Sequence, residues 1–124
     1  MADELDAYSR TVSTVAAEVT RHVASLRMRR GSGSAVVFAD DGLLVTNAHV
    51  VGQAGGGTAA FVDGTETRVD VVGADPLSDL AVLRARGTTP PAATLGDADR
   101  LVVGQLVVAI GNPLGFAGSV TAGV

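Results

Sequence analysis

The first twenty residues carry apolar side chains at helical spacing. These side chains recur every three or four positions, which places them on one stripe of a helix. The pattern predicts a helix from about residue 4 to residue 20. After that point the spacing shifts to alternation, which is typical of strands. The residues of the stripe are Leu5, Tyr8, Val12, Val15 and Val19.

A first hairpin is predicted directly after the helix. Residues 20–29 alternate along a first strand, and the glycines Gly31 and Gly33 are expected to break it. The next strand leads to Asp40-Asp41-Gly42, whose aspartate-glycine pair is typical of tight hairpins. Residues 43–51 are predicted to form the returning strand.

Three further segments continue the pattern of short strands joined by glycine-containing turns. Residues 52–57 are predicted to be a glycine-rich loop, in which Gly55-Gly56-Gly57 is a flexible connection. Residues 58–62 and 67–72 then form a hairpin around Asp63-Gly64. Residues 79–84 complete the series as a short strand.

The last part of the chain starts with a connection and ends with two strands. Residues 87–91 include two prolines, which cannot donate to a central strand ladder, so this segment is predicted to join two subdomains. Residues 106–110 and 119–124 are predicted strands, separated by Gly111-Asn112-Pro113-Leu114-Gly115. Many short strands joined by glycine turns indicate an all-β antiparallel barrel or sandwich.

Size and charge narrow the function classes. A chain of 124 residues suits one domain with a sizeable core. A net charge of −4 argues against a nucleic-acid partner, because phosphate contacts require clustered Lys and Arg. The basic cluster of Arg27, Arg29 and Arg30 is interpreted as a solvated flank of a strand.

The sequence predicts no metal and no organic cofactor. Cysteine is absent, and the two histidines, His22 and His49, are far apart and outside any His-Glu-x-x-His pattern. The amino terminus is acidic where an export signal would be basic. No apolar run approaches the roughly 18 residues needed to span a bilayer, so neither export nor a membrane span is predicted from these residues.

One histidine and one aspartate are candidates for proton-relay chemistry. His49 ends a predicted strand and can project from a rim, while Asp79 begins an apolar run, where an unpaired buried carboxylate would be costly. A histidine ring nitrogen is one natural partner for this carboxylate. Two plainer readings stay open. Asp75 or Asp79 simply caps the turn at Pro76–Ser78, and a lone histidine is more often held by backbone contacts.

Four segments in a fixed order resemble the HtrA (Deg) family of trypsin-like serine endopeptidases. The resemblance covers roughly residues 20 to 124, and the four segments in this order are more specific than any one of them. The segments are Gly31–Val37, Leu44–Val51, Asp75–Leu83 and Val103–Gly115.

The resemblance implies an all-β chymotrypsin-like fold. It implies an N-terminal helix over residues 1–21, a first antiparallel β-barrel over 22–88, and an inter-barrel linker with the opening strands of a truncated second barrel over 89–124. It also implies that His49 is the general base, Asp79 its orienting carboxylate and Asp75 a turn residue. Polypeptides would be the substrates, and such families usually act outside the cytoplasm.

The family's nucleophile loop has no match in this sequence. Neither Gly-Asn-Ser-Gly-Gly nor Gly-Asp-Ser-Gly-Gly occurs, and Ser32, between two glycines, is interpreted as structural. The chain is therefore expected to be an amino-terminal portion that is inactive alone, since serine and oxyanion hole each contribute orders of magnitude in rate. The alternative is a non-catalytic polypeptide-binding or chaperone-like module that uses exposed strand edges. Association of two copies through such edges, or through the N-terminal segment, is a further expectation.

Overall fold

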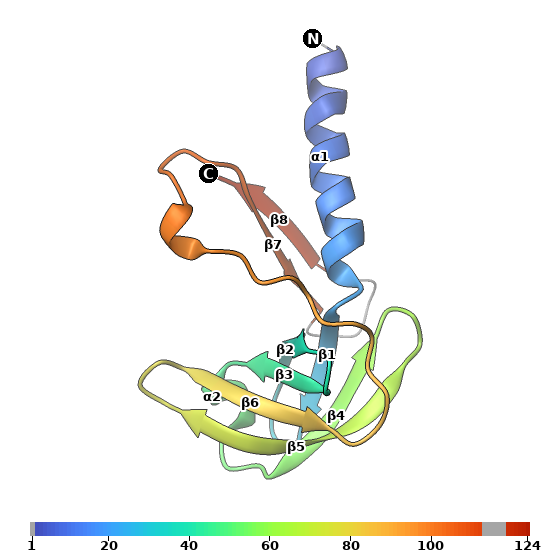
Figure 1. Cartoon of the computed structure of the whole chain (residues 1–124), viewed down its shortest axis with the longest axis vertical. Coiled ribbons are helices and arrows are strands. Elements are labelled where there is room, and N and C mark those ends of the chain that lie inside the picture. The colour runs from blue at the N-terminus through green and yellow to red at the C-terminus, as the bar shows by residue number, and fades with distance from the viewer. Residues whose placement is uncertain (1, 113–118) are drawn as a thin grey trace.

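The structure is a computed structural model that describes residues 2–112 and 119–124. A long helix, α1 (Ala2–Thr20), projects from a β-barrel, and a separate two-stranded sheet lies alongside the helix (Figure 1). The helix predicted for residues 4–20 is confirmed. The barrel and the small sheet contain the strands that alternation predicted.

Six strands form a closed antiparallel barrel in the order β1-β2-β3-β6-β5-β4. Strand β4 pairs back onto β1 and closes the sheet, so this unit is a barrel and not a sandwich. Both predicted hairpin glycines, Gly42 and Gly64, have positive φ, as tight turns require. The strands are β1 (Val23–Met28), β2 (Ser32–Ala39), β3 (Leu43–Thr46), β4 (Gly56–Phe61), β5 (Glu66–Asp75) and β6 (Leu80–Ala85).

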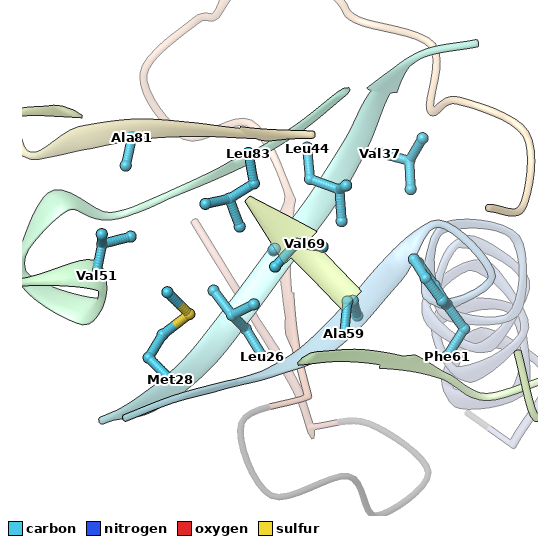
Figure 2. Close-up of a cluster of buried hydrophobic side chains, with 12 residues drawn as sticks. Leu26, Met28, Val37, Leu44, Val51, Ala59, Phe61, Val69, Ala81 and Leu83 are labelled. Carbon is cyan, nitrogen blue, oxygen red and sulfur yellow. The ribbon is translucent and has the colours of Figure 1, made fainter. Parts of the chain in front are cut away.

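Alternate residues of the six strands point into the barrel and pack against one another (Figure 2). Because successive side chains on a strand face opposite sides, each strand contributes every second residue to this core. Burying one such leucine or valine side chain stabilises the fold by about 1.5–3 kcal/mol. The largest fully buried side chains are Leu26, Leu44, Leu83, Val23, Val37 and Val69.

Two glycine predictions were wrong. Gly33 does not break a strand but lies within β2, and Gly56 and Gly57 are strand residues of β4 rather than a flexible connection. A Cβ at Gly56 would lie 2.6 Å from the carbonyl oxygen of Val69, and one at Gly57 would lie 2.3 Å from that of Arg27. These glycines allow β4 to approach both neighbouring strands.

The predicted returning strand is also shorter than expected. Strand β3 ends at Thr46, and the chain then forms a single helical turn, α2 (Ala48–Val51). Apolar residues continue through both segments, so the pattern alone could not mark the change. In the turn, Ala48 and Val51 are buried while His49 faces outward, which a helical period allows and a continued strand would not.

The apolar stripe of α1 is only partly used for packing. Val12, Val15 and Val19 are half-buried, and the helix contacts strand β7 (Val107–Gly111). Tyr8 is 49% exposed, because the earlier turns of the helix extend past the barrel (Figure 1). The side chain of Leu5 lies outside the described residues.

The segment after the barrel runs along the barrel surface before the second sheet begins. His22 Nδ1 lies 2.6 Å from the carbonyl oxygen of Pro91 and donates to it, and the Ala93 amide donates to the Val37 carbonyl at 2.8 Å. A short 3-10 turn, η1 (Ala98–Arg100), follows. The proline-rich connection is therefore attached to His22, the residue before β1, and to β2.

The two predicted late strands are present as β7 and β8 (Ser119–Gly123), which pair antiparallel with each other. Of the predicted connection Gly111–Gly115, residues 113–115 lie outside the described residues. Within residues 2–112 and 119–124, none of the helices combines the length and apolar character that crossing a bilayer requires.

Candidate active site

His49 and Asp79, 30 residues apart in the sequence, form a two-point contact at one rim of the barrel. His49 Nδ1 lies 2.7 Å from Asp79 Oδ2, and the backbone N–H of His49 donates to Asp79 Oδ1 at 2.9 Å. One carboxylate therefore fixes both the ring and the peptide group of the same histidine. The structure brings together the pair that the sequence singled out.

Strand pairing explains how the two residues meet. Strands β3 and β6 are antiparallel neighbours, with Thr46 opposite Ala81. Continuing this register by two or three residues brings the start of α2 beside the residue that precedes β6. The contact therefore follows from the barrel topology, which places the end of β3 against the start of β6.

Asp79 supplies a capping interaction that α2 does not provide for itself. Asn47, the N-cap residue, makes no side-chain capping bond, so the amide of His49 finds its acceptor in the Asp79 carboxylate. The Asn47 side chain instead donates from Nδ2 to the backbone carbonyl of Asp79 at 3.1 Å. Asn47 was not among the predicted site residues. It stands inside the Leu44–Val51 segment, but nothing in the pattern indicated this contact.

Asp79 has a left-handed backbone, with φ of 57°. Among the described residues it is the one non-glycine with positive φ. Such a conformation costs on the order of 1 kcal/mol or more and persists where surrounding contacts fix it. Here the contacts are the Asn47 amide on the carbonyl and His49 on the carboxylate.

Asp75 has the turn role that was expected of it. Its Oδ1 accepts from the Leu77 amide at 3.1 Å, and its Oδ2 accepts from the Ser78 hydroxyl at 3.0 Å. The two aspartates around Pro76–Ser78 thus do different things. Asp75 caps the turn, whereas Asp79 reaches across to α2.

The pair is more exposed than the apolar run after Asp79 suggested. The side chains of His49 and Asp79 are 71% and 43% exposed. Asp79 has the partner that was expected. The reason given for that partner, burial of the carboxylate, was wrong, because the side chain is only partly buried. Solvent reaches His49 from the outer side of the rim, so the ring is accessible to a bound molecule.

Hydrogen bonds lower the pKa of Asp79 from its ordinary value of 3.8. The largest cause is the backbone N–H of His49, followed by its ring; partial desolvation opposes them. Asp79 is therefore ionised at neutral pH. Since an ionised carboxylate can only accept, His49 Nδ1 must carry a proton, and in the neutral imidazole Nε2 is then the acceptor.

A pH titration tests this electrostatic arrangement. Because the folded pKa of Asp79 is depressed, the contact with His49 contributes stability above pH 3.8 and loses it as the pH falls through the folded pKa. We expect carboxyl-carbon NMR to give a midpoint for Asp79 below 3.8. In His49→Ala the midpoint should rise only part of the way, since the backbone donor remains. A wild-type midpoint at or above 3.8 would contradict the arrangement.

Two glycines, one just before β2 and one within it, allow α2 to lie close to the barrel wall. A Cβ at Gly33 would come within 2.8 Å of a Val50 methyl carbon, and one at Gly31 would lie 3.2 Å from the Val50 carbonyl oxygen. The helical turn that carries His49 therefore packs directly on the Gly31-Ser32-Gly33 segment. Ser32 lies exposed between these glycines, and its structural role stays a prediction.

A second set of polar contacts ties the small sheet to the same region. Ser34 Oγ accepts from the backbone amide of Asn112 at 2.6 Å, and Thr46 Oγ1 donates to the Ser34 carbonyl at 2.8 Å. Asn112 is almost fully buried. The end of β7 is thus attached to β2 and, through it, to the strand that leads into α2.

No metal centre accompanies this site among the described residues. Within residues 2–112 and 119–124, no three His, Asp or Glu side chains gather in a way that could hold an ion.

Comparison with known proteins identifies the family. The family model of the trypsin-like peptidase domain matches residues 33–124. A protein of Halomonas elongata, named a probable periplasmic serine endoprotease DegP-like, is 45% identical over 96 residues, which is 77% of this chain. A protein of the same description from Brucella suis is 43% identical over 94 residues, or 74% of this chain.

Solved structures agree in fold. The HtrA-type protease AlgW with a tripeptide superimposes with a TM-score of 0.82 at 38% identity, over 90% of this chain and 38% of that one. The serine endoprotease from Yersinia pestis gives 0.77 at 33% identity, over 86% and 40%. The chain belongs to the trypsin-like peptidase family, in its HtrA (Deg) group, and has the chymotrypsin-like fold. It spans about a fifth of the length of the curated relatives it matches, 20% and 18% for the two named above.

Proposed function

We propose that this chain contributes two catalytic residues to a serine endopeptidase of the HtrA type. His49 is the general base and Asp79 holds it in position. The observation that carries the proposal is the double contact of the Asp79 carboxylate with the ring and the amide of His49. An exposed imidazole with a free Nε2 is what a serine hydroxyl requires for activation.

The proposed reaction is acyl transfer from a polypeptide. A serine Oγ forms a bond to the carbonyl carbon of the peptide while its proton moves to His49 Nε2. That proton then passes to the leaving amine as the peptide C–N bond breaks. Water, deprotonated by the same nitrogen, hydrolyses the acyl-enzyme and restores the serine. Asp79 stays ionised throughout and stabilises the imidazolium.

We also propose that the chain contains three structural regions. Residues 1–21 form the N-terminal helix, 22–88 the first barrel, and 89–124 the linker with the opening strands of a second barrel. Two features support these boundaries. The barrel strands run from Val23 to Ala85, and β7 and β8 pair only with each other among the described strands.

We predict that the isolated 124-residue polypeptide does not cleave peptides. The nucleophile loop is missing from its sequence, and the base and its carboxylate alone provide neither the covalent step nor oxyanion stabilisation. Fluorogenic peptide turnover by the purified polypeptide should stay at the buffer rate. Turnover that disappears in His49→Ala would contradict this prediction.

The coding region after Val124 provides the complementary test. A following Gly-Asn-Ser-Gly-Gly segment supports the peptidase, and the extended chain should then cleave peptides in a manner that depends on His49. A folded extended chain with this segment but without any cleavage would count against the proposal.

One observation favours a second candidate, a polypeptide-binding module. In the described sheet of β7 and β8, each strand has a single partner, and Val107 and Val120 are 49% and 44% exposed. Open edges with apolar side chains can accept an extended segment or a second copy of the chain. Size-exclusion elution that shifts with protein concentration would support self-association. A stop codon directly after Val124 would also favour this candidate.

A further inference from the structure

An open hollow of about 530 Å³ lies directly beside His49. Three segments line it. These are the turn between β1 and β2 at Arg29–Gly31, residues 49–51 of α2, and the segment from Gly52 to Gly56, the first residue of β4. Because His49 itself is part of the lining, a molecule in the hollow touches the residue that we propose to be the general base.

The hollow is basic although the whole chain is acidic. Arg29 and Arg30 are both exposed, and within the described residues neither has a carboxylate within ion-pair distance. By contrast Arg86 is paired with Asp70 at 2.8 Å. No Asp or Glu is found among the described residues that line the hollow. Two cationic side chains at one wall are therefore left without neutralising partners.

Three of the five lining residues from 52 to 56 are glycines. A Cβ added at Gly52 or at Gly55 would meet no atom within 4 Å, so these glycines border open space. A polypeptide can approach the hollow closely at these two glycines. The sequence interpretation of the three arginines as a solvated flank was therefore incomplete, because two of them, Arg29 and Arg30, face this cavity.

We propose that the hollow binds the carboxylate of an Asp or Glu side chain in a polypeptide held beside His49. Arg29 and Arg30 are its partners and determine the specificity of this subsite. Guanidinium groups match a carboxylate in charge and in planar geometry, and such charge-assisted bonds are the stronger ones. The polypeptide nature of the ligand rests on the proposed peptidase function; the charge preference rests on the hollow itself.

The test uses NMR titration of the 124-residue chain with two blocked pentapeptides that differ only in a central Glu or Gln. We expect the Glu peptide to shift the Arg29 and Arg30 Nε–H signals and the amides of Gly52 and Gly55. Its Kd should be about five-fold lower than that of the Gln peptide, a modest factor because the arginines are exposed. The difference should shrink as NaCl rises from about 50 to 500 mM.

Variants assign the preference to the two arginines. The double change Arg29→Ala with Arg30→Ala should abolish the preference for Glu. The double change Arg10→Ala with Arg100→Ala, the same loss of two exposed charges outside the hollow, should retain it. Changing both Arg29 and Arg30 to Glu should reverse the preference towards a peptide with a central Lys. This reversal distinguishes lost recognition from lost folding, because a misfolded chain gains no new preference.

Three results would overturn the proposal. They are equal affinity for the Glu and Gln peptides, absence of shifts with either peptide at millimolar concentration, and a Glu preference that survives in the double Ala variant. Inorganic phosphate is a separate titrant; if it binds while the two peptides do not differ, the hollow is a general anion site. None of these binding results tests peptide turnover. The peptidase proposal is tested by variants of His49 and Asp79, so it and the subsite proposal can fail independently.

Discussion

Asp79→Asn is expected to lower kcat of a peptide-cleaving, extended form of this chain by about 10⁴-fold. The physical reason is the tautomer of His49. The carboxylate accepts from Nδ1 at 2.7 Å and therefore keeps the proton on that nitrogen. An asparagine amide can donate its N–H₂ to Nδ1, which moves the ring proton to Nε2. The nitrogen that should accept the serine proton is then blocked.

Asp75→Asn is the matched control. Asp75 lies in the same turn, but its carboxylate contacts Leu77 and Ser78 and not the histidine. Its effect on kcat should stay within a few-fold, while kcat/KM of the Asp79→Asn variant falls together with kcat. Similar losses in the two variants would show that the turn as a whole matters, and the specific role of Asp79 would then be wrong.

Leu83→Ala should lower the free energy of unfolding by about 2–5 kcal/mol, a large part of the 5–15 kcal/mol typical of a domain. Leu83 is fully buried in β6 and packs in the cluster of Figure 2. Strand β6 also pairs with β3, and this pairing brings Asp79 to His49. We therefore expect the His49 ring signal to lose its contact with Asp79 at lower urea concentration than in the wild type.

Leu77→Ala provides the control for this prediction. It removes the same atoms from a side chain that is 99% exposed, so the free energy of unfolding should change by no more than about 0.5 kcal/mol. Urea denaturation followed by far-UV circular dichroism measures both variants. If both variants lost the same stability, the barrel interior could not be the main source of stability.

Most strands could be predicted because alternation is a direct consequence of barrel walls that are buried on one side. The helix of residues 2–20 was also visible in its apolar spacing. The wrong secondary-structure predictions occurred where one apolar pattern fits both a strand and a helical turn. The apolar residues 43–51 fit a strand, yet residues 48–51 form a helical turn, because burying Ala48 and Val51 while exposing His49 suits the end of β3 at the rim.

The glycines show a second kind of error. In the sequence Gly55-Gly56-Gly57 suggests flexibility, but Gly56 and Gly57 are held in β4 because a side chain there would meet neighbouring backbone. Such a requirement depends on strands that are distant in the chain. It cannot be seen in a local pattern.

The sequence by itself determined the residue types and their order: a histidine, then an aspartate, within segments that match one protease family and share its strand rhythm. Only the tertiary structure decided that the two side chains meet and that Asn47 supports the aspartate. It also decided that Arg29 and Arg30 lie at the same cavity as the histidine. Spacing along a chain fixes local periodicity, whereas contacts between residues tens of positions apart depend on which strands pair and where each one ends.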